Sequence, residues 1–482
     1  MTLSELVDVE PSQLVGGGGM DVAGLTADSR QVKPGYVFVA VPGTKADGSQ
    51  FIDDAVAKGA IALVVNQEAS IPGGLKIPVF VAPEPRRSLS MMAARYYGAQ
   101  PATVVAVTGT SGKTSVAEFT RQIFSACGRQ SASLGTIGVI KPSGAVYGSL
   151  TTPDPVTLHA SLAELAREGV THLAMEASSH GLDQYRLDGV KLAAAAFTNL
   201  GRDHMDYHPN IGHYFDAKMR LFNELLQPGQ PAVINTDGND AHDAIVTARA
   251  RGLKVLTVGT KGETVRLDRV DREGFAQRLT LHHDGRTYSV LLPLVGTYQV
   301  ENALVAVGLA IAAGENPEQA IQSIAQLAGV KGRLEIIGEC CGALAVVDYA
   351  HKPEALIAAL DACRPFATGK LICVFGCGGD RDRGKRPIMG GIAVEKADIV
   401  IVTDDNPRTE NAGSIRAEIL VNAKGAQEIG DRTEAIRTAV GMMQPGDVVL
   451  VAGKGHETGQ IVGTTTLPFS DHDVLRAALG IA

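Results

Sequence analysis

Several features of secreted, membrane-spanning and metal-scaffold proteins are missing from this sequence. Its 6 cysteines include no C-x-x-C pair, and no histidine cluster completes a zinc pattern. No stretch approaches the ~20 consecutive apolar residues that a membrane-spanning helix needs. The N-terminus has no basic flank followed by an apolar segment, as a secretory signal would. We therefore expect a cytoplasmic protein with reduced thiols and no membrane insertion.

An excess of basic residues is also missing, since the net charge is −8. Proteins that bind duplex nucleic acid are more often basic, so we expect no nucleic-acid partner. The content of 45% hydrophobic and 20% charged residues is ordinary for a globular protein. The 55 glycines stand between apolar runs, which favours tight strand-to-helix turns over disorder.

The length of 482 residues predicts about three domains, at roughly 100–200 residues each. We place them at 1–98, 99–331 and 332–482. Apolar runs that alternate with helical patterns predict an α/β fold with parallel sheets covered by helices. The predicted strands are 36–41, 60–65, 103–107, 171–175, 193–198, 231–235, 344–347, 370–375, 397–403 and 447–452. A more polar, β-rich insertion is predicted at about 253–293.

The strongest local signal is a glycine-rich loop between the strand at 103–107 and a helix whose apolar face carries Val116, Phe119, Ile123 and Phe124. Glycines let backbone amides approach an anion, and the helix N-terminus adds partial positive charge. Lys113 would reach the β- and γ-phosphates of ATP, and the Thr114 hydroxyl would bind Mg²⁺. An ordinary glycine-rich turn is the alternative, which Gly-Lys-Thr at a strand–helix junction disfavours. The predicted phosphate-binding residues are Gly109, Thr110, Ser111, Gly112, Lys113, Thr114 and Ser115.

Two further strands end in residues suited to binding a metal ion. Glu176 follows the strand at 171–175, and His204 follows the strand at 193–198. The carboxyl ends of parallel strands meet at one edge of a sheet, so both residues should lie beside the phosphate loop. A carboxylate oxygen suits Mg²⁺. Taken singly, each residue could equally be a surface or capping residue.

Three strands of the last domain lead into charged loops, at 376–386, 403–408 and 453–457. A single charged loop is usually a solvated surface. Three of them at successive strand ends predict one shared polar crevice.

Several of these motifs resemble those of the Mur ligases. The phosphate loop has the short form Thr-Gly-Thr-x-Gly-Lys-Thr, with Val107 where the general pattern has glycine. This form is similar to that of Mur ligases and folylpolyglutamate synthetases. The segments 175–182, 198–208, 332–335 and 346–353 also resemble Mur ligase motifs. The resemblance spans essentially the whole chain and implies a Rossmann-like N-terminal domain, a central phosphate-loop ATPase domain and a Rossmann-like C-terminal domain.

The resemblance also implies a set of catalytic residues. Glu176 and His204 would help to hold two Mg²⁺ ions. Lys218 would be carbamylated by CO₂ to N6-carboxylysine and become a further ligand. Residues outside the phosphate loop would lie near the nucleotide, namely Asn302, Arg333, Asp348 and His351.

The amino-acid substrate implied by the resemblance is meso-diaminopimelate. Its far carboxylate suits a planar cationic fork, which Arg supplies and Lys does not. The segment 405–408 is similar to the motif of the diaminopimelate-adding ligases, and Glu457 would pair with the ammonium. The residues implied to contact this substrate are Arg381, Asp405, Asn406, Pro407, Arg408, Gly453 and Glu457.

The second substrate implied is a UDP-linked muramoyl-dipeptide, an intermediate of peptidoglycan synthesis and hence of cell growth and division. The residues implied to bind its UDP moiety are Ala27, Ser29, Thr44, Lys45 and Ala46. The residues implied to bind the muramoyl-dipeptide are Thr151, Thr152, Ser178, Gln184 and Arg186. We expect the protein to be a monomer with small-molecule partners only.

The hypothesis is therefore an ATP-dependent, amide-forming ligase that acts through an acyl-phosphate. A folylpolyglutamate synthetase would use the same chemistry, but the N-terminal domain with its segment 28–30 disfavours it. A lysine-adding ligase is disfavoured by Arg408. A GTPase switch would usually carry an Asn-Lys-x-Asp motif, which is absent, and a structural cell-wall protein would not need three polar loops.

Overall fold

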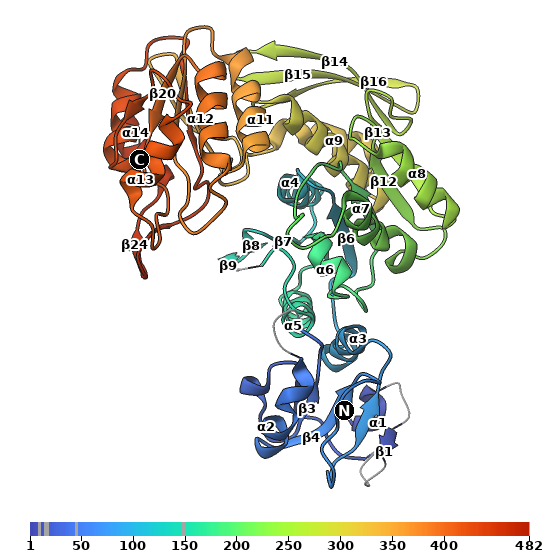
Figure 1. Ribbon diagram of the computed structural model, residues 1–482. Helices are drawn as coiled ribbons and strands as arrows, with labels where there is room; N and C mark the ends of the chain where they lie inside the picture. Colours follow the sequence, from blue (N-terminus) through green and yellow to red (C-terminus); the bar gives the residue numbers. More distant parts are fainter. Residues whose placement is uncertain (8–10, 14–18, 44–46, 147–149, 482) are drawn as a thin grey trace. The chain divides into compact units, whose positions relative to one another are not determined.

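The computed structural model describes residues 1–7, 11–13, 19–43, 47–146 and 150–481 (Figure 1). The chain forms two compact units, one of residues 1–264 with 305–320 and the other of residues 265–304 with 321–482. Thr44, Lys45 and Ala46 lie outside the described residues. The domain boundaries predicted from the sequence remain a prediction.

The first unit begins with a small sheet whose strand order is β1-β5-β4-β3-β2. Strands β2 to β5 are parallel, and β1 is antiparallel at the edge. Along β3, Val37 and Val39 belong to one buried cluster and Phe38 to another, so both faces are covered. Helix α3 (Pro85–Tyr97) packs on the first cluster and α2 (Ile52–Ala57) on the second. The strands are β1 (Pro11–Gln13), β2 (Gly24–Thr26), β3 (Tyr36–Val39), β4 (Ala60–Val65) and β5 (Val79–Val81).

The second sheet of this unit has six parallel strands in the order β13-β12-β11-β6-β10-β7. Antiparallel strands β8 and β9 extend it beyond β7. Its strands are β6 (Thr103–Thr108), β7 (Ser131–Gly135), β8 (Gly138–Lys141), β9 (Gly144–Val146), β10 (His172–Glu176), β11 (Ala194–Phe197), β12 (Pro231–Asn235) and β13 (Lys254–Gly259).

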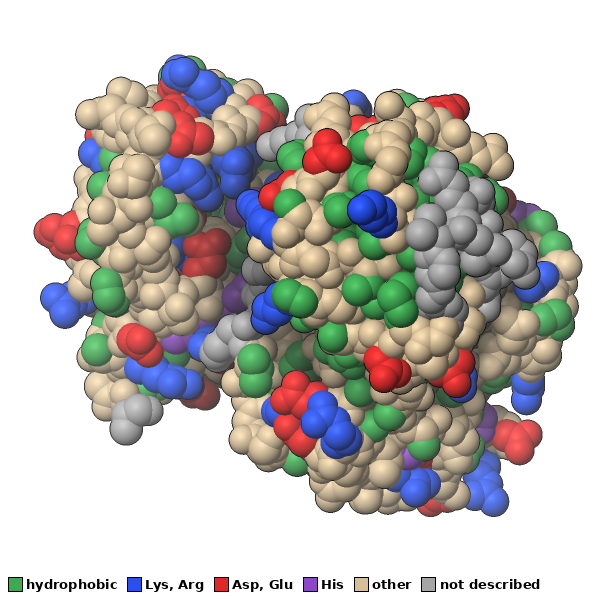
Figure 2. Space-filling view, turned by 90° about the horizontal axis from the view of Figure 1, so that it is seen from below, with side chains coloured by type: hydrophobic (Ala, Val, Ile, Leu, Met, Phe, Trp, Pro, Cys, Tyr) green, Lys and Arg blue, Asp and Glu red, His purple; other side chains and the backbone are tan. Residues whose placement is uncertain are grey.

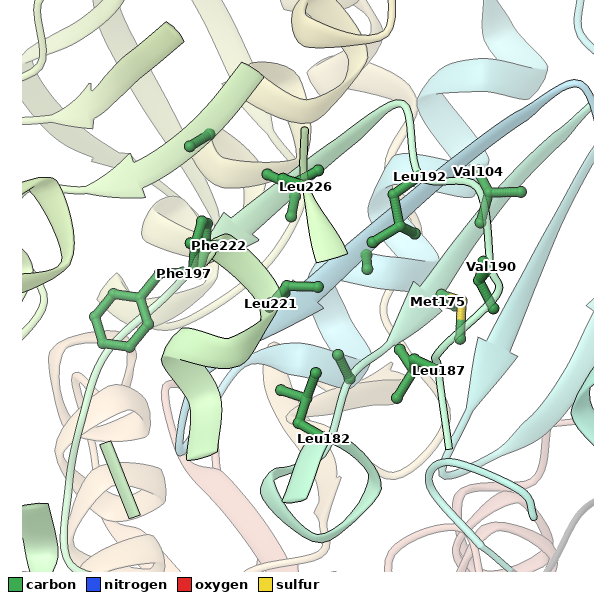
Figure 3. Close-up of a cluster of buried hydrophobic side chains, with 14 of the residues drawn as sticks. Val104, Met175, Leu182, Leu187, Val190, Leu192, Phe197, Leu221, Phe222 and Leu226 are labelled. Atoms are coloured by element: carbon green, nitrogen blue, oxygen red, sulfur yellow. The ribbon is translucent and has the colours of Figure 1, made fainter. Parts of the chain in front are cut away.

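Helices cover this second sheet through apolar side chains. The predicted helix after the phosphate loop is α4 (Lys113–Ala126), and Val116, Phe119, Ile123 and Phe124 are all fully buried. Figure 3 shows one buried cluster, in which Met175 of β10 lies among side chains of the segments that follow the strands. The other helices are α1 (Leu3–Leu6), α5 (Pro155–Arg167), α6 (Ser179–Asp183), α7 (Ile211–Arg220) with a π-helical turn (Leu221–Leu225), and α8 (Ala241–Ala250).

The second unit contains an antiparallel ribbon and a mostly parallel sheet. The ribbon consists of β14 (Val265–Glu273), β15 (Ala276–His283) and β16 (Arg286–Leu292). The sheet has the order β17-β18-β22-β19-β20-β21, with only β17 antiparallel. Its strands are β17 (Glu335–Cys340), β18 (Ala343–Asp348), β19 (Leu371–Phe375), β20 (Ile399–Val402), β21 (Gln427–Glu428) and β22 (Val448–Ala452).

Both faces of this sheet are also covered. Helices α11 (Pro353–Cys363), α12 (Lys385–Lys396) and α13 (Ala412–Leu420) pack on one face, and α14 (Arg432–Gly441) and α15 (Asp471–Leu479) pack on the other. A hairpin of β23 (Gly459–Val462) and β24 (Thr465–Pro468) follows the last strand. Helices α9 (Thr297–Ala312) and α10 (Pro317–Gln322) contribute residues to both units.

The α/β class with parallel sheets is confirmed, and each strand predicted from the sequence is present to within one or two residues at either end. Within the described part of the chain, no helix combines the length and the apolarity needed to cross a bilayer. On the face shown in Figure 2, Lys and Arg side chains are interspersed with Asp and Glu side chains.

One buried ion pair ties together three elements of the second unit. Arg432 at the start of α14 donates to both carboxylate oxygens of Asp471 on α15, at 2.7 and 2.8 Å, and both side chains are fully buried. Its Nη2 also donates to the carbonyl of Ala452, the last residue of β22, at 3.0 Å. Arg432 therefore supports the strand end from which the loop at 453–457 departs.

Replacing Arg432 with Met should lower the free energy of unfolding by about 3–5 kcal/mol, because Asp471 is left as an unpaired buried charge. Urea denaturation followed by circular dichroism measures this loss. Arg278→Met, which removes an exposed ion pair with Glu273, is the matched control and should cost no more than about 1 kcal/mol. Equal losses in the two variants would contradict the importance assigned to the buried pair.

Candidate active site

The phosphate loop joins the end of β6 to the start of α4. Gly109 and Gly112 both have positive φ, 146° and 86°. A Cβ on Gly109 would lie 1.9 Å from Thr198 Oγ1, so only glycine fits at this position. No side chain among the described residues caps α4. A helix N-terminus without a side-chain cap is suited to binding a phosphate through its backbone N–H groups.

Two lysines from distant parts of the sequence meet at this loop. Lys113 Nζ donates to the carbonyls of Gly109 and Thr110, both at 2.9 Å. Lys218 Nζ, from α7, donates to the same Gly109 carbonyl at 2.7 Å. Lys218 is only 1% exposed, and its amine lies 4.1 Å from the centre of the Tyr214 ring. Burial, reinforced by the charge of Lys113, holds the pKa of the Lys218 amine well below its usual value.

Glu176 is the last residue of β10 and is buried. Its Oε1 accepts a hydrogen bond from the Thr136 backbone N–H at 2.7 Å, and its Oε2 accepts one from Thr136 Oγ1 at 3.2 Å. A Cβ on Gly135 would lie 2.1 Å from Oε1, so the glycine that ends β7 makes room for the carboxylate. Thr136 could not be predicted as a partner of Glu176, because nothing in its local sequence distinguishes it from other threonines.

His204 lies in a tight turn after β11, with a left-handed backbone at φ 56°. Its carbonyl accepts from the backbone N–H groups of Tyr207 and His208, at 3.1 and 2.9 Å. Its own N–H donates to Asp203 Oδ1 at 2.8 Å, and its ring lies 4.8 Å from the ring of His180. The imidazole is partly exposed and is held in place by this turn.

The donor set at this edge of the sheet fits Mg²⁺ better than a transition metal. No group of three or more His, Cys, Asp or Glu side chains in the described residues is arranged to hold a metal ion. The oxygen donors are the Glu176 carboxylate and the hydroxyl of Thr114, which is 8% exposed. Mg²⁺ usually takes one or two carboxylates and completes its shell with water and substrate phosphates. Such an arrangement needs no protein cage of three ligands.

The residues predicted to bind the muramoyl-dipeptide form one hydrogen-bonded network. Thr152 Oγ1 accepts from the backbone N–H and the hydroxyl of Ser178, both at 3.1 Å, and donates to the Glu176 carbonyl at 3.1 Å. Arg186 donates to the Thr152 carbonyl at 2.7 Å and to Gln184 Oε1 at 2.8 Å. The structure thus brings these four residues together beside Glu176.

The remaining predicted residues of the first unit are placed in two regions. Thr151 Oγ1 lies 2.9 Å from Thr136 Oγ1, which connects it to the Glu176 site. Ala27 and Ser29 lie just after β2 in the N-terminal sheet. Ala27 packs on the apolar cluster there, and the carbonyl of the buried Ser29 accepts from Lys58 Nζ at 3.1 Å. In the described residues, no hydrogen bond joins these two to the Thr152 network.

In the second unit, the residues predicted near the nucleotide are linked around the end of β18. Asp348 accepts from the backbone N–H groups of Leu334 and Ala350, at 2.7 and 2.8 Å. Burial raises the pKa of Asp348 to about 6. The Arg333 guanidinium stacks 4.6 Å from the centre of the Tyr349 ring. His351 Nδ1 lies 2.8 Å from the Tyr349 carbonyl, and burial lowers the pKa of His351 to about 4.

Asn302 joins this group through a residue that the sequence analysis left out. Gln299 Nε2 donates to the Arg333 carbonyl at 3.1 Å, and Asn302 Nδ2 donates to Gln299 Oε1 at 3.1 Å. The glutamine at 299 therefore positions Asn302 against the segment that carries Arg333.

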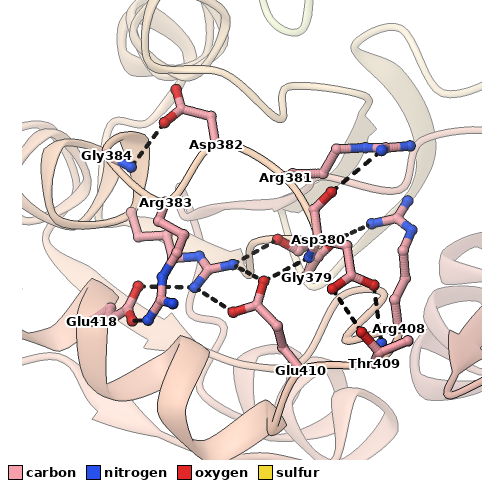
Figure 4. Close-up of polar contacts among 12 residues, drawn as sticks. Gly379, Asp380, Arg381, Asp382, Arg383, Gly384, Arg408, Thr409, Glu410 and Glu418 are labelled. Carbon is pink, nitrogen blue, oxygen red and sulfur yellow. Dashed lines mark hydrogen bonds and ion pairs between the residues drawn. The ribbon is translucent and has the colours of Figure 1, made fainter.

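The loops at 376–386 and 403–411 are tied together by polar contacts (Figure 4). Asp380 accepts from the backbone N–H and the hydroxyl of Thr409, at 3.1 and 2.8 Å. Arg386 is fully buried and donates to both carboxylate oxygens of Glu410, at 2.8 and 2.9 Å. Hydrogen bonds from Arg386 lower the pKa of Glu410 to about 2. The two loops thus form one rigid polar structure.

This structure brings the two predicted arginine ligands near one another. Arg408 Nη1 donates to the Gly379 carbonyl at 2.7 Å, and a Cβ on Gly378 would lie 2.8 Å from that Nη1. Arg381 stands two residues after Gly379, is exposed, and makes a 3.4 Å contact with the Asp380 carbonyl. Two guanidinium groups on adjoining loops suit an anionic ligand.

The other predicted amino-acid-binding residues meet beside the end of β22. Asn406 Nδ2 donates to Glu457 Oε2 at 2.9 Å. Asp405, which precedes Asn406, is buried, and a Cβ on Gly453 would lie 2.7 Å from its Oδ2. Lys454 was not among the predicted residues, and its side chain is fully buried between Asn406 and Glu457. Its position between two glycines directly after an apolar strand is the signal that could have found it.

Comparison with known proteins accounts for most of the chain. Residues 21–97 match the Mur ligase family catalytic domain, and residues 107–310 match the Mur ligase middle domain. Residues 332–455 match the glutamate ligase domain of Mur ligases. The chain belongs to the Mur ligase family.

Individual relatives agree with this assignment. A protein from Bradyrhizobium diazoefficiens named UDP-N-acetylmuramoyl-L-alanyl-D-glutamate–2,6-diaminopimelate ligase is 57% identical, over 99% of each chain. A protein of the same name from Agrobacterium fabrum is 58% identical, over 96% of this chain and 94% of its own. A solved structure with that name has a TM-score of 0.75 at 33% identity and covers 100% of this chain and 99% of its own.

Proposed function

We propose that this chain is an ATP-dependent ligase that joins meso-diaminopimelate to UDP-N-acetylmuramoyl-L-alanyl-D-glutamate in peptidoglycan precursor synthesis. The observation that carries the proposal is the near-full-length identity of 57–58% to proteins named for this reaction. The polar loops of the second unit support it, since they present arginines and a carboxylate at the ends of adjacent strands. ATP and a UDP-linked sugar are cytoplasmic metabolites, so we propose that the reaction takes place in the cytoplasm.

The contacts of Arg408 support recognition of the far carboxylate of diaminopimelate. In the described residues, its only side-chain hydrogen bond is the one from Nη1 to Gly379. A guanidinium has five N–H donors, so the remaining ones can bind a carboxylate bidentately. Arg381 on the adjoining loop adds a second positive charge. L-Lysine has no carboxylate at that end and would leave both charges unbalanced.

Arg408→Lys should lower kcat/KM for meso-diaminopimelate about 10- to 100-fold, because an ammonium keeps the charge but loses the bidentate fork, worth about 1.5–3 kcal/mol. This change in kcat/KM is measured as ATP-dependent phosphate release with the muramoyl-dipeptide nucleotide, with meso-diaminopimelate or L-lysine offered in parallel. The control is Arg278→Lys, at an exposed ion pair of the same unit, and its kcat/KM for meso-diaminopimelate should equal that of the wild type.

The same assay separates the alternative functions. Wild-type protein that uses L-lysine in preference to meso-diaminopimelate would favour the lysine-adding ligase. Phosphate release with a folate and glutamate, but not with the muramoyl-dipeptide nucleotide, would favour a folylpolyglutamate synthetase.

The proposed reaction has two steps. The terminal carboxylate of the D-glutamyl residue attacks the γ-phosphorus of ATP, ADP leaves, and an acyl-phosphate forms. The amine of diaminopimelate then attacks the acyl carbon, loses a proton, and the tetrahedral intermediate collapses to the amide with release of phosphate. Positioning and electrostatic stabilisation would supply most of the acceleration. No nucleophile from the protein is required.

The protein's own groups would bind and orient the reactants. Lys113 would exchange the carbonyls of Gly109 and Thr110 for β- and γ-phosphate oxygens and offset the charge of the transferring phosphoryl group. Arg186, in the network beside Glu176, would orient the attacking carboxylate. Bound Mg²⁺ ions would offset further phosphate charge. The ligands that we propose for them are Thr114, Glu176, His204 and carbamylated Lys218.

Lys113→Ala should slow acyl-phosphate formation about 100-fold or more, the effect of removing one group that stabilises transition-state charge. The measurement is hydroxylamine trapping with ATP and the muramoyl-dipeptide nucleotide, with the amino acid left out. Lys261→Ala, at an exposed lysine of the same unit, should trap as much hydroxamate as the wild type. Full trapping by Lys113→Ala would refute the role of this lysine.

The surroundings of Lys218 support its proposed carbamylation. A neutral amine attacks CO₂, a bond forms between nitrogen and carbon, and a proton is lost, which leaves an anionic carbamate. Burial of the Lys218 amine favours its neutral form. The modified side chain would place beside Lys113 an anion able to bind Mg²⁺.

Wild-type protein equilibrated with ¹³C-bicarbonate should show a carbamate carbonyl signal by NMR, and Lys218→Ala should lack it and lose about 100-fold or more in kcat. The loss is expected because a transition-state charge contact of this kind is typically worth that much. Lys261→Ala is again the control and should keep both the signal and the activity. Wild-type protein that takes up no label at Lys218 while fully active would contradict carbamylation.

A further inference from the structure

We propose that Lys454 is a positioning residue that sets the geometry of the amine-binding end of the amino-acid site. This inference rests on the proposed function, since it concerns how the ammonium of diaminopimelate is recognised. It is carried by three side chains that we call the Lys454 triad, namely Lys454, Asn406 and Glu457.

The first observation is the complete burial of a lysine that has two polar partners. Lys454 is 0% exposed, and its Nζ donates to Asn406 Oδ1 at 2.9 Å and to Glu457 Oε2 at 3.0 Å. Gly453 and Gly455 on either side have positive φ, 117° and 53°. A buried ammonium without partners is strongly unfavourable, so this lysine binds its two acceptors tightly.

The second observation is that Lys454 and the Ile461 backbone N–H together fix which way the Asn406 amide points. Asn406 Oδ1 accepts from Lys454 Nζ and from the Ile461 backbone N–H, both at 2.9 Å. Both groups are donors only, so the reversed amide would place its NH₂ against two donors. The Nδ2 group must therefore face Glu457, to which it donates at 2.9 Å.

The third observation is the asymmetry of the Glu457 carboxylate. Its Oε2 accepts from both Lys454 and Asn406, at 3.0 and 2.9 Å. In the described residues, no hydrogen bond reaches its Oε1. The Glu457 side chain is 33% exposed, whereas that of Lys454 is 0% exposed. A ligand can therefore contact Glu457 but not Lys454, which acts through its neighbours.

These contacts define a division of roles. Lys454 and Asn406 hold one carboxylate oxygen, and the other oxygen is left to accept from the ammonium of the substrate. Lys454 also offsets part of the negative charge that Glu457 and the nearby Asp405 bring to the loop. Without Lys454, Asn406 Oδ1 keeps only the Ile461 N–H as a donor, Glu457 Oε2 keeps only Asn406, and the Glu457 side chain can rotate away from its binding orientation.

A double-mutant cycle tests this role against a purely structural one. The variants are Lys454→Met, Glu457→Gln and the double variant, with Lys424→Met at an exposed position as the matched control. KM for meso-diaminopimelate, KM for ATP and kcat are measured on the full chain, and each melting temperature is recorded.

Lys454→Met should raise KM for meso-diaminopimelate about 10-fold or more and change KM for ATP less than 2-fold. The double variant should be no worse than Glu457→Gln alone, because Lys454 acts through that carboxylate. The proposal would be overturned if the KM increases of Lys454→Met and Glu457→Gln multiplied in the double variant. It would also be overturned if Lys454→Met raised KM equally for meso-diaminopimelate and for ATP.

The double-mutant cycle remains informative if Lys454→Met alone fails to fold. The double variant removes both charges of the Lys454–Glu457 ion pair, so its comparison with Glu457→Gln still decides the question. In that case Lys454→Gln, which keeps an NH₂ donor group without the charge, should raise KM for meso-diaminopimelate less than Glu457→Gln does, and a larger rise would overturn the proposal. Wild-type and Lys424→Met proteins that release no phosphate with meso-diaminopimelate would refute the proposed function instead.

Discussion

Two lysine amines converge on the carbonyl oxygen of Gly109, and the arrangement of the first unit's site depends on that convergence. It requires a loop residue without a side chain, because Thr198 occupies the space where a Cβ would lie. It also requires α7 to bring Lys218 to the loop from 109 residues away in sequence. Lys113 reaches the loop from the start of α4, whereas Lys218 is buried on α7.

In the second unit, buried cations connect separate elements, because each of them must have polar partners. Arg386 joins the two charged loops through Glu410, and Arg432 joins α14, α15 and the end of β22. Lys454 does the same on a smaller scale between Asn406 and Glu457. In each case protein groups satisfy the buried cation, while Arg381 on one of the charged loops is exposed. The buried charges thus hold together loops that carry other, exposed charges.

Local pattern was sufficient to predict the strands and the helix after the phosphate loop. Runs such as 103–107 and 447–452 are apolar on both faces, as parallel strands covered by helices must be, so their burial could be expected from composition. The places of Glu176 and His204 after two strands could also be expected in this way, because strand ends in such a sheet lie at one edge, and their role as metal ligands stays a prediction. The role of Lys218 came from family resemblance alone, since an isolated lysine on a helix is usually solvated.

The sequence by itself determined the α/β class, the strand positions, the phosphate loop and the residue types at the strand ends, because each is encoded in a short contiguous segment. Only the tertiary structure decided which of those residues touch, as with Lys218 at Gly109, Thr136 at Glu176, Gln299 between Asn302 and Arg333, and Lys454 between Asn406 and Glu457. The physical reason is that a hydrogen bond across loops depends on distance and direction in space, and residue spacing along the chain carries neither.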